Sequence, residues 1–262
     1  MTYNEAAVSE TFDQLLRQAP DLDPTMDGAL DNLDQYHTGG SDAVDLLIET
    51  LDLSPGMSVL DVGSGFGGPA RQVARRTGAR VVGIDLAQEY VEAARELTRR
   101  AGLSDLVEYR NVDIADLRPE DQFDSAVTMH VQMNVADKVV WFSHIADRLV
   151  EGARLAVWEV CQPSGSEVVW PMPWSLDGTD SFLVDGGSLL RSIESAGFST
   201  DSWVDRTEWA GDWFDRTFAD GPPAGPALPM VIYDGYTRVL NLAAALEAKS
   251  LQVWQGTFTK TV

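Results

Sequence analysis

Cysteine and histidine are scarce in this sequence, and their scarcity excludes several kinds of site. The one cysteine, Cys161, has no second thiol with which to form an intrachain disulfide. No Cys/His cluster surrounds it, so a structural zinc ion has no ligands, and we expect a small buried side chain near a strand end. No run of histidines and carboxylates has metal-ligand spacing, so no metal site is expected.

Basic residues are also few. Lys and Arg number 19 against 41 Asp and Glu, which gives a formal net charge of −22 and a pI of about 4.3. Because nucleic acid is bound through clustered Lys and Arg, we expect no nucleic-acid partner. The acidity fits a solvated surface or the attraction of a cationic substrate.

Long apolar runs are absent. No stretch reaches the roughly 18 apolar residues of a membrane-spanning helix, and the polar start lacks the basic and apolar regions of a signal peptide. We therefore expect no membrane partner and a cytoplasmic location. The length of 262 residues and the 44% hydrophobic content predict a single domain, residues 1–262, with a substantial core.

From Met57 onward the sequence alternates between strand and helix patterns. The expected strands are 58–62, 80–84, 107–111, 123–129, 154–160, 199–206 and 251–259, and the expected helices are 69–77, 88–101, 138–149 and 187–196. Strands that alternate with helices imply parallel pairing and a doubly wound α/β sheet.

Other segments flank or interrupt this alternation. The expected parts are a helical N-terminal cap (1–52, with helices over 10–18 and 43–51), a first half of the sheet (53–161) and a second half (162–262) with insertions at 162–185 and 207–250. Ligands bind at the carboxyl ends of parallel strands, so we expect the cap and the insertions to enclose a site there.

A glycine-rich loop follows the first strand. The strand ends at Asp61, and the small residues of Gly63-Ser64-Gly65 let the backbone approach a ligand closely. The second strand ends at Asp85, which places a carboxylate where it can accept both hydroxyls of a ribose. Together these features predict a cofactor that contains a nucleoside.

Two classes of cofactor fit this pattern. Gly63, Gly65 and Gly68 satisfy G-x-G-x-x-G, so a dinucleotide-dependent oxidoreductase is one alternative. Asp61 before the first glycine, the long helical cap and the strand that ends the sequence favour S-adenosylmethionine instead.

The motifs resemble those of class I S-adenosylmethionine-dependent methyltransferases, from Met57 to about Arg206 and again in the last strand. The likeness is carried by 61–68 (D-V-G-S-G-F-G-G), 107–114 (V-E-Y-R-N-V-D-I), 123–130 (F-D-S-A-V-T-M-H) and 149–155 (L-V-E-G-A-R-L). In the last of these, Glu151 and Ala153 replace the usual Pro and Gly of a turn.

The resemblance implies the fold and the cofactor site. The fold is a Rossmann-like, doubly wound, mostly parallel seven-stranded sheet with an antiparallel C-terminal strand. The cofactor is S-adenosyl-L-methionine, with S-adenosyl-L-homocysteine as product. The implied contacts are Asp61, Gly63, Ser64 and Gly65 to the methionine and ribose end, Asp85 to the ribose diol, Leu86 to the adenine ring, and Asp113 and Ile114 to the adenine amine and face. Asp85 can instead cap a helix, and Asp116 can substitute for Asp113.

The segment that leaves the fourth strand carries candidate acceptor contacts. His130, Gln132 and Asn134 are polar, and a histidine near its ordinary pKa of about 6.5 can act as a general base. We rank His130 first among possible bases. The alternative is that it contacts the cofactor or a neighbouring carbonyl.

The cap and the insertions carry further candidates. Tyr36 and His37 precede Gly39-Gly40, whose flexibility suits a lid. Trp170 and Trp174 can enclose an apolar ring or a methylated ammonium, or else cover their own loop.

The sequence thus predicts an S-adenosylmethionine-dependent enzyme that methylates a small molecule at N, C or O, with small amines slightly favoured. A narrower likeness to sarcosine/dimethylglycine N-methyltransferases and quinone C-methyltransferases does not choose the acceptor, because the same fold serves many reactions. A repurposed protein of this fold, such as a cyclase, is a further alternative. The oligomeric state, monomer or homodimer, stays open.

Overall fold

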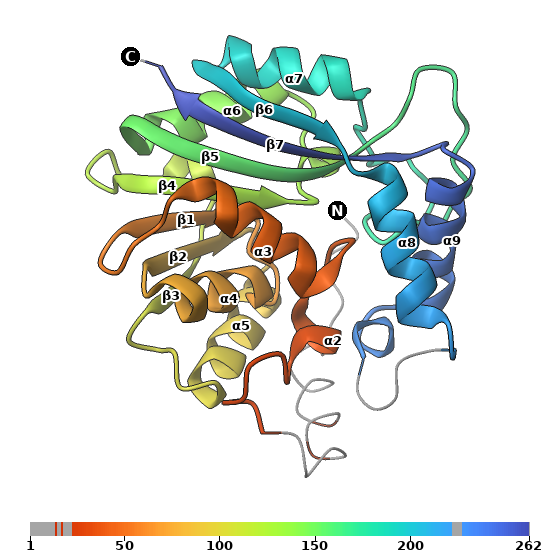
Figure 1. The fold of residues 1–262 in the computed structure, drawn as a ribbon, viewed down its shortest axis with the longest axis horizontal. Helices are drawn as coiled ribbons and strands as arrows, with labels where there is room; N and C mark the ends of the chain where they lie inside the picture. The colour runs from red at the N-terminus through yellow and green to blue at the C-terminus, as the bar shows by residue number, and fades with distance from the viewer. Residues whose placement is uncertain (1–13, 15–16, 18–22, 222–226, 262) are drawn as a thin grey trace.

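The computed structural model describes Gln14, Arg17 and residues 23–221 and 227–261 (Figure 1). The helix expected over 10–18 therefore lies mostly outside the described residues. The elements are α2 (Asp31–Asp34), α3 (Gly40–Leu51), β1 (Ser58–Val62), α4 (Gly68–Thr77), β2 (Arg80–Asp85), α5 (Gln88–Arg100), β3 (Val107–Asn111), η1 (Ile114–Asp116), β4 (Phe123–Met129), η2 (Gln132–Asn134), α6 (Lys138–Asp147), β5 (Leu149–Cys161), α7 (Gly186–Ser195), β6 (Phe198–Asp205), α8 (Thr207–Phe218), η3 (Leu228–Met230), α9 (Gly235–Glu247) and β7 (Gln252–Lys260).

The seven strands form one sheet in the order β3-β2-β1-β4-β5-β7-β6. The pairs from β3 to β5 are parallel, and β7 runs antiparallel to both β5 and β6. The predicted Rossmann-like fold with an antiparallel C-terminal strand is confirmed. The strand order reverses between β1 and β4, the kind of position where ligands bind in open α/β sheets.

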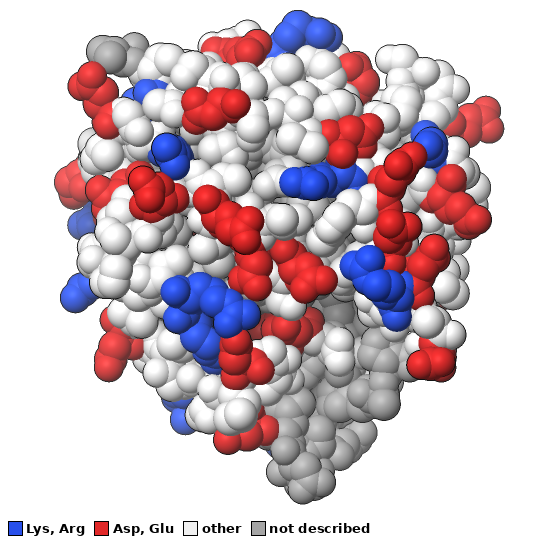
Figure 2. Space-filling view, viewed as in Figure 1, with Lys and Arg blue, Asp and Glu red and all other residues white. Residues whose placement is uncertain are grey.

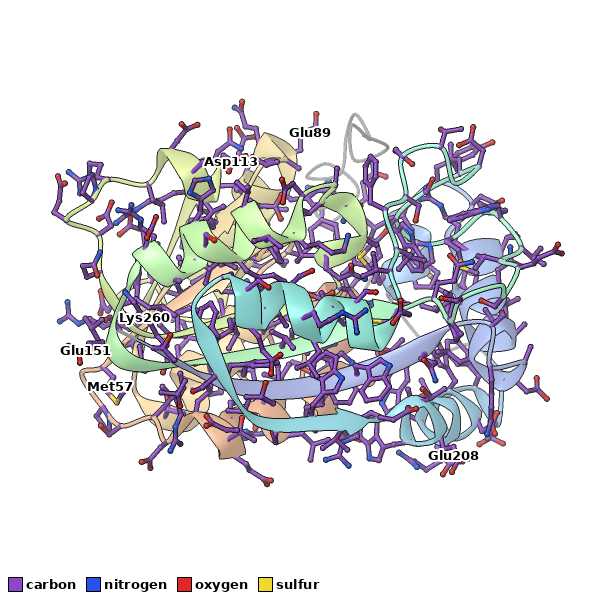
Figure 3. The ribbon with its side chains drawn as sticks, turned by 90° about the horizontal axis from the view of Figure 1, so that it is seen from above. Met57, Glu89, Asp113, Glu151, Glu208 and Lys260 are labelled. Atoms are coloured by element: carbon purple, nitrogen blue, oxygen red, sulfur yellow. The ribbon has the colours of Figure 1, made fainter. Side chains whose placement is uncertain are left out.

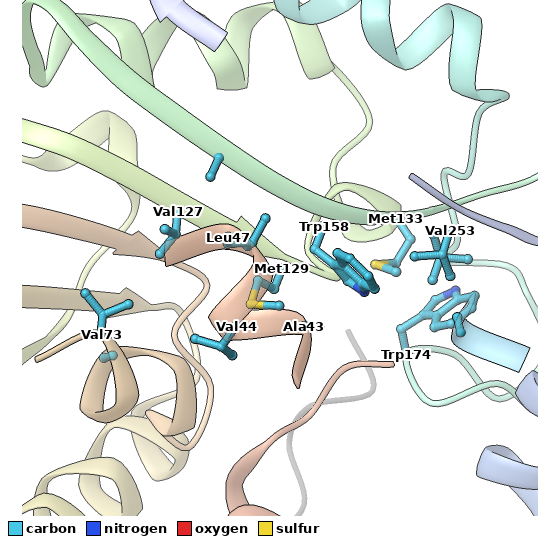
Figure 4. Packing of buried hydrophobic residues seen from close by; sticks show 14 of the residues in the cluster. Ala43, Val44, Leu47, Val73, Val127, Met129, Met133, Trp158, Trp174 and Val253 are labelled. Carbon is cyan, nitrogen blue, oxygen red and sulfur yellow. The ribbon is translucent and has the colours of Figure 1, made fainter. Parts of the chain in front are cut away.

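Each face of the sheet buries its own core. Alternate residues point to opposite faces, so Val59 joins the cluster under α3, α4 and α5, whereas Leu60 joins the cluster under α6 and α7. Figure 4 shows the first cluster where Trp158, Met133 and Val253 lie near the beginning of α3. The two clusters make a three-layer α/β/α molecule.

The element boundaries differ from expectation in three places. The strand predicted over 154–160 begins at Leu149, which pairs with Phe123, and the preceding helix therefore ends at Asp147. The expected insertion after β6 contains two helices, α8 and α9, which pack on each other. Figure 3 shows Glu208 of α8 at the end of the molecule away from Met57, which precedes β1, so α8 lies toward the carboxyl ends of the parallel strands.

Cys161 is free and fully buried at the end of β5. On the face in Figure 2, acidic and basic side chains are interspersed without a continuous basic patch over the described residues. Within the described ranges, no helix is long and apolar enough to cross a membrane.

Candidate functional site

A cavity of about 610 Å³ lies at the carboxyl ends of β1, β2 and β4. This volume lies within the range of roughly 300–1,000 Å³ that is typical of small-molecule sites. The residues predicted for the site that line the cavity are Tyr36, His37, Asp61, Gly63, Ser64, Gly65, Asp85, Leu86, Asp113, Ile114, His130 and Asn134. The topology therefore brings twelve of the fifteen predicted residues to one place.

The glycine loop is bonded mainly to the protein itself. The N–H groups of Gly63 and Ser64 both donate to the Ile84 carbonyl at 2.9 Å, and the N–H of Gly67 donates to the Ser64 carbonyl at 2.8 Å. The Gly65 N–H donates to Oδ2 of Asp85 at 2.9 Å. We expected backbone N–H groups of this loop to reach the ligand. For these four that expectation is wrong, because their hydrogens are already bonded within the protein.

The glycines act through their shape. At Gly63, with φ of 78°, an added Cβ would lie 2.3 Å from Cγ2 of Val131. At Gly65, with φ of 52°, an added Cβ would have nothing within 4 Å. Gly63 therefore allows close packing against the turn after β4, and Gly65 leaves space that belongs to the cavity.

Two carboxylates lie beside this loop, Asp61 buried and Asp85 half-buried. Asp85 accepts the N–H groups of Gly65 and Ala87, each at 2.9 Å, and burial raises its pKa. Asp61 is 2% exposed, and its Oδ2 has no hydrogen-bond partner among the described residues. Burial, followed by the charge of Asp85, raises the pKa of Asp61 to about 7. A cationic ligand group would stabilise the ionised Asp61 carboxylate against both its burial and the charge of Asp85.

Arg71 connects the loop to its surroundings. Its Nη2 donates to Oδ2 of Asp34 in the cap and to the carbonyl of Phe66 in the loop, both at 2.7 Å. Its Nη1 donates to the Thr98 hydroxyl at 2.9 Å, and the Tyr109 hydroxyl donates to the Gly67 carbonyl at 3.1 Å. The Asp34–Arg71 pair is buried, so it fixes the cap against the loop.

The part of the cavity that Leu86 lines is open to solvent. Leu86 is 52% exposed although it lines the cavity, whereas Ile114 is buried. Asp113 accepts the Ala115 N–H at 2.9 Å and so caps η1. Its position at the side of the molecule near Glu89 is visible in Figure 3.

The turn after β4 is held by Glu159 of β5. This fully buried carboxylate accepts the N–H groups of Val131 and Gln132 at 3.0 and 3.2 Å and the Thr128 hydroxyl at 3.2 Å. Burial raises the pKa of Glu159 to about 8. His130, the first residue of the turn, has φ of 56°, a region that few non-glycine residues adopt and that is concentrated at functional sites.

His130 is held by contacts with the cap. Its Nε2 lies 3.0 Å from the Thr38 hydroxyl and accepts the Thr38 N–H at 3.4 Å. Burial and the nearby His37 lower the pKa of His130 well below its ordinary value. The nitrogen that would take up a proton is therefore already bonded to the cap.

Three predicted acceptor contacts do not line the cavity. Gln132 is fully buried, and its amide donates to the Val160 carbonyl, because η2 turns this side chain toward β5. Trp174 donates to the Ser181 hydroxyl at 3.0 Å, and Trp170 packs against Gly178. The two tryptophans cover their own insertion, which was the alternative considered for them.

A hydrogen bond and close packing hold the cap against the rest of the molecule. The Tyr36 hydroxyl donates to the Pro173 carbonyl at 2.7 Å, which ties the cap to the first insertion. An added Cβ would lie 2.6 Å from the Trp209 ring at Gly39 and 3.0 Å from the Trp213 ring at Gly40. These glycines therefore allow close packing at the start of α3.

Several site residues were not predicted. Phe66, Tyr90 and Trp141 line the cavity, and they were missed because aromatic residues at helix starts and in loops have no distinctive spacing. Thr38 and Glu159 act through contacts of long sequence separation. Within the described residues, no three His, Cys, Asp or Glu side chains gather in a way that could hold a metal ion.

The chain was compared with models of known families. The family model described as "Mycolic acid cyclopropane synthetase" matches residues 31–169, just over half of the chain. The matched range contains α2 and α3 of the cap, the glycine loop and the turn after β4.

Individual proteins are similar over more of the chain. "Methyltransferase GfsG" of Streptomyces halstedii is 29% identical over 77% of this chain and 71% of its own length. The chain spans only about a third of the next two curated relatives. Among solved structures, the "[4+2]-Cyclase SpnF" has a TM-score of 0.67 at 24% identity, covering 100% of this chain and 97% of its own. Geranyl diphosphate C-methyltransferase from Streptomyces coelicolor A3(2), in complex with S-adenosyl-L-homocysteine, has a TM-score of 0.68 at 18% identity, covering 84% and 76%. These structures share the fold of this chain.

Proposed function

Because the chain belongs to the mycolic acid cyclopropane synthetase family of class I S-adenosylmethionine-dependent methyltransferases, we propose that it transfers a methyl group to a small molecule. The methyl donor is S-adenosylmethionine, bound at the carboxyl ends of β1 and β2. The observation that carries this proposal is the buried Asp61 carboxylate, whose unpartnered Oδ2 and raised pKa suit a cationic ligand.

The residues of the cavity fit this cofactor. Asp61 Oδ2 and the Ser64 hydroxyl are buried polar atoms without partners among the described residues, so a ligand with an ammonium group offers the missing bonds. Asp85, already held by two N–H groups, keeps lone pairs for the hydroxyls of a ribose. Leu86 and Ile114 offer apolar contact to an adenine ring, with Asp113 beside them.

The same loop disfavours a dinucleotide. A pyrophosphate at a Rossmann loop is bound by free backbone N–H groups. The N–H groups of Gly63, Ser64, Gly65 and Gly67 all donate within the protein. The loop therefore has few donors left for a phosphate, and the carboxylates of Asp61 and Asp85 would face its negative charge.

The residues of the chain position the reacting groups and exclude water from them. The cofactor, when bound, supplies a methyl group on a positively charged sulfur, which is already activated for in-line displacement. The cap holds Tyr36 and His37 over the cavity through the Asp34–Arg71 pair and the Tyr36–Pro173 bond. Phe66, Tyr90 and Trp141 make much of the lining aromatic, which excludes water from the reacting groups.

We propose that the acceptor is a compound of the natural-product type. Support comes from the similarity to GfsG and to geranyl diphosphate C-methyltransferase, from the aromatic lining, and from the sheet end at which the cavity lies. Small amines, which the acidity slightly favours, stay among the candidates.

A cyclase is a second candidate function, because the likeness to SpnF extends over the whole chain. The experiment that separates the two offers S-adenosylmethionine with a ¹³C-labelled methyl group together with a panel of polyketide, terpenoid and small-amine acceptors. A methyltransferase gives a labelled product with at least one acceptor. A cyclase binds the labelled cofactor and leaves its methyl group in place.

We also propose that residues 1–262 act as a single domain in the cytoplasm, as a monomer or homodimer. One continuous sheet and a single buried thiol support this. Cell fractionation and light scattering of the purified protein test the location and the oligomeric state.

A further inference from the structure

Three side chains, from the cap, the turn after β4 and β5, form a hydrogen-bonded chain beside the cavity. Trp158 of β5 lies beside the beginning of α3 (Figure 4), and its Nε1 donates to the Thr38 hydroxyl at 3.0 Å. The same hydroxyl lies 3.0 Å from Nε2 of His130, which also accepts the Thr38 N–H at 3.4 Å. Thr38 and Trp158 are buried, so water does not compete for these bonds.

The direction of each hydrogen bond follows from groups that can only donate. An indole N–H has no lone pair to offer, so the Thr38 oxygen accepts from Trp158 and its own hydrogen is available for His130. The Thr38 backbone N–H also can only donate, so Nε2 of His130 must present its lone pair. In the neutral ring the hydrogen is therefore on Nδ1.

Nδ1 faces in a different direction. It has no hydrogen-bond partner in the part of the chain that the structure describes. The structure also has several fully buried polar atoms without a partner, and Nδ1 of His130 is not one of them. His130 is partly exposed and lines the cavity with Val131 and Asn134. Nδ1–H is therefore a donor available to a bound molecule.

The neighbouring His37 offers no lone pair to the cavity at Nε2. Gln72 donates from Nε2 to the Ser41 carbonyl and to Asp45, so its oxygen faces the amide of Gln35. The Gln35 oxygen is consequently the atom that faces Nε2 of His37, at 2.9 Å. Nδ1 of His37 lies 3.2 Å from the Thr38 carbonyl. Each ring nitrogen of His37 thus contacts an oxygen of the protein itself.

We propose that His130 is a neutral, Nδ1-protonated hydrogen-bond donor that binds an oxygen lone pair of the acceptor. This proposal rests on the methyltransferase function proposed above and names the class of acceptor: a molecule with a carbonyl, ether or hydroxyl oxygen near the atom that is methylated. Trp158 and Thr38 are positioning residues, because they fix which nitrogen carries the hydrogen. The strained backbone of His130 aims the ring at this task.

The tautomer is tested directly by long-range ¹H–¹⁵N correlation spectra of the ¹⁵N-labelled full chain at pH 7. The variants His37→Gln and His144→Gln assign the three histidine patterns. We expect a pyridine-type Nε2 and a pyrrole-type Nδ1 for His130. Thr38→Val keeps the backbone N–H but removes the hydroxyl, and we expect it to move His130 toward a mixture of tautomers. An Nε2-protonated or doubly protonated His130 in the wild-type chain would overturn the proposal.

The acceptor class is tested with two probes of nearly equal shape. Acetophenone carries a carbonyl oxygen where α-methylstyrene carries a methylene group. With the chain saturated with S-adenosyl-L-homocysteine, we expect acetophenone to move the Nδ1–H resonance of His130 downfield and α-methylstyrene to leave it in place. Equal shifts with both probes, or no shift with either, would overturn the assignment of an oxygen ligand.

The tautomer of His130 and the binding of the cofactor product are measured independently. Tight binding of the homocysteine product with the wrong tautomer of His130 overturns this inference and leaves the methyltransferase function standing. The expected tautomer in a chain that does not bind the product overturns the proposed function, and with it the acceptor class.

Discussion

The backbone N–H of Gly65 donates a 2.9 Å hydrogen bond to Oδ2 of Asp85, which joins the loop after β1 to the end of β2. The bond fixes the position of a carboxylate that would face a ribose and uses a donor that a dinucleotide would need. It also orients Asp85 before any ligand arrives, which lowers the ordering cost of binding.

Removal of this carboxylate should weaken cofactor binding. We expect Asp85→Ala to weaken the binding of S-adenosyl-L-homocysteine by at least about 1–3 kcal/mol, because the ribose hydroxyls lose their acceptor and the Gly65 N–H is left unpaired. Calorimetric titration measures the change. Asp105→Ala, at an exposed position outside the cavity, is the matched control and should bind as the wild type does. Unchanged affinity in Asp85→Ala would refute the ribose role.

The two loop glycines should respond differently to alanine. Gly63→Ala places its Cβ 2.3 Å from Val131, so we expect loss of stability from steric overlap in addition to backbone strain. Gly65→Ala meets no protein atom within 4 Å, so we expect only the roughly 1–2 kcal/mol cost of a left-handed alanine, together with weaker ligand binding. Urea unfolding and calorimetry measure the two quantities. Equal stability of the two variants would contradict the different packing assigned to the two positions.

Cofactor binding should depend on pH through Asp61. Its pKa is raised to about 7 in the ligand-free protein by burial and by Asp85, so it is partly protonated at neutral pH. A cationic ligand binds the ionised form, so affinity should rise with pH up to about 7 and fall by up to about tenfold per unit below it. Binding should also release a proton, which calorimetry in buffers of different ionisation enthalpy detects. Asp61→Asn should bind more weakly and lose the pH dependence, and a pH-independent wild type would refute the role of Asp61.

The buried pair of Arg71 and Asp34 should be important for stability. Arg71→Met leaves the Asp34 carboxylate buried without its cation, and we expect a loss of about 3–5 kcal/mol in the free energy of unfolding. Arg99→Met, at an arginine that is 67% exposed, should change it by no more than about 0.5 kcal/mol. The double variant Asp34→Leu/Arg71→Met should recover part of the loss. Equal urea midpoints for the wild type and Arg71→Met would show that the pair does not hold the cap.

The cofactor half of the site was predictable because its residues follow strands. Asp61 is the second-last residue of β1 and Asp85 ends β2, and Gly63 and Gly65 lie in the loop after β1, so topology alone places them together. The alternation of strands and helices likewise predicted the sheet. What the pattern did not reveal is that the loop N–H groups are bonded within the protein, because the partner of Gly63 and Ser64 is a carbonyl of another strand.

The acceptor half was less predictable. His130 and Gln132 look equivalent as polar residues after a strand, but the short η2 helix sends one side chain to the cavity and the other into the core. The tautomer of His130 depends on its contact with Thr38, which is 92 residues away in the chain. It also depends on the bond from Trp158 to Thr38, which joins residues 120 apart. Neither helical nor strand periodicity reports contacts of that range.

The central claim is that this chain binds S-adenosylmethionine. Calorimetric titration of the wild-type chain with S-adenosyl-L-homocysteine and, separately, with NADH tests it most directly. The account predicts saturable one-to-one binding of S-adenosyl-L-homocysteine, weakened in Asp85→Ala, and no binding of NADH. Tight binding of NADH without binding of S-adenosyl-L-homocysteine would contradict it.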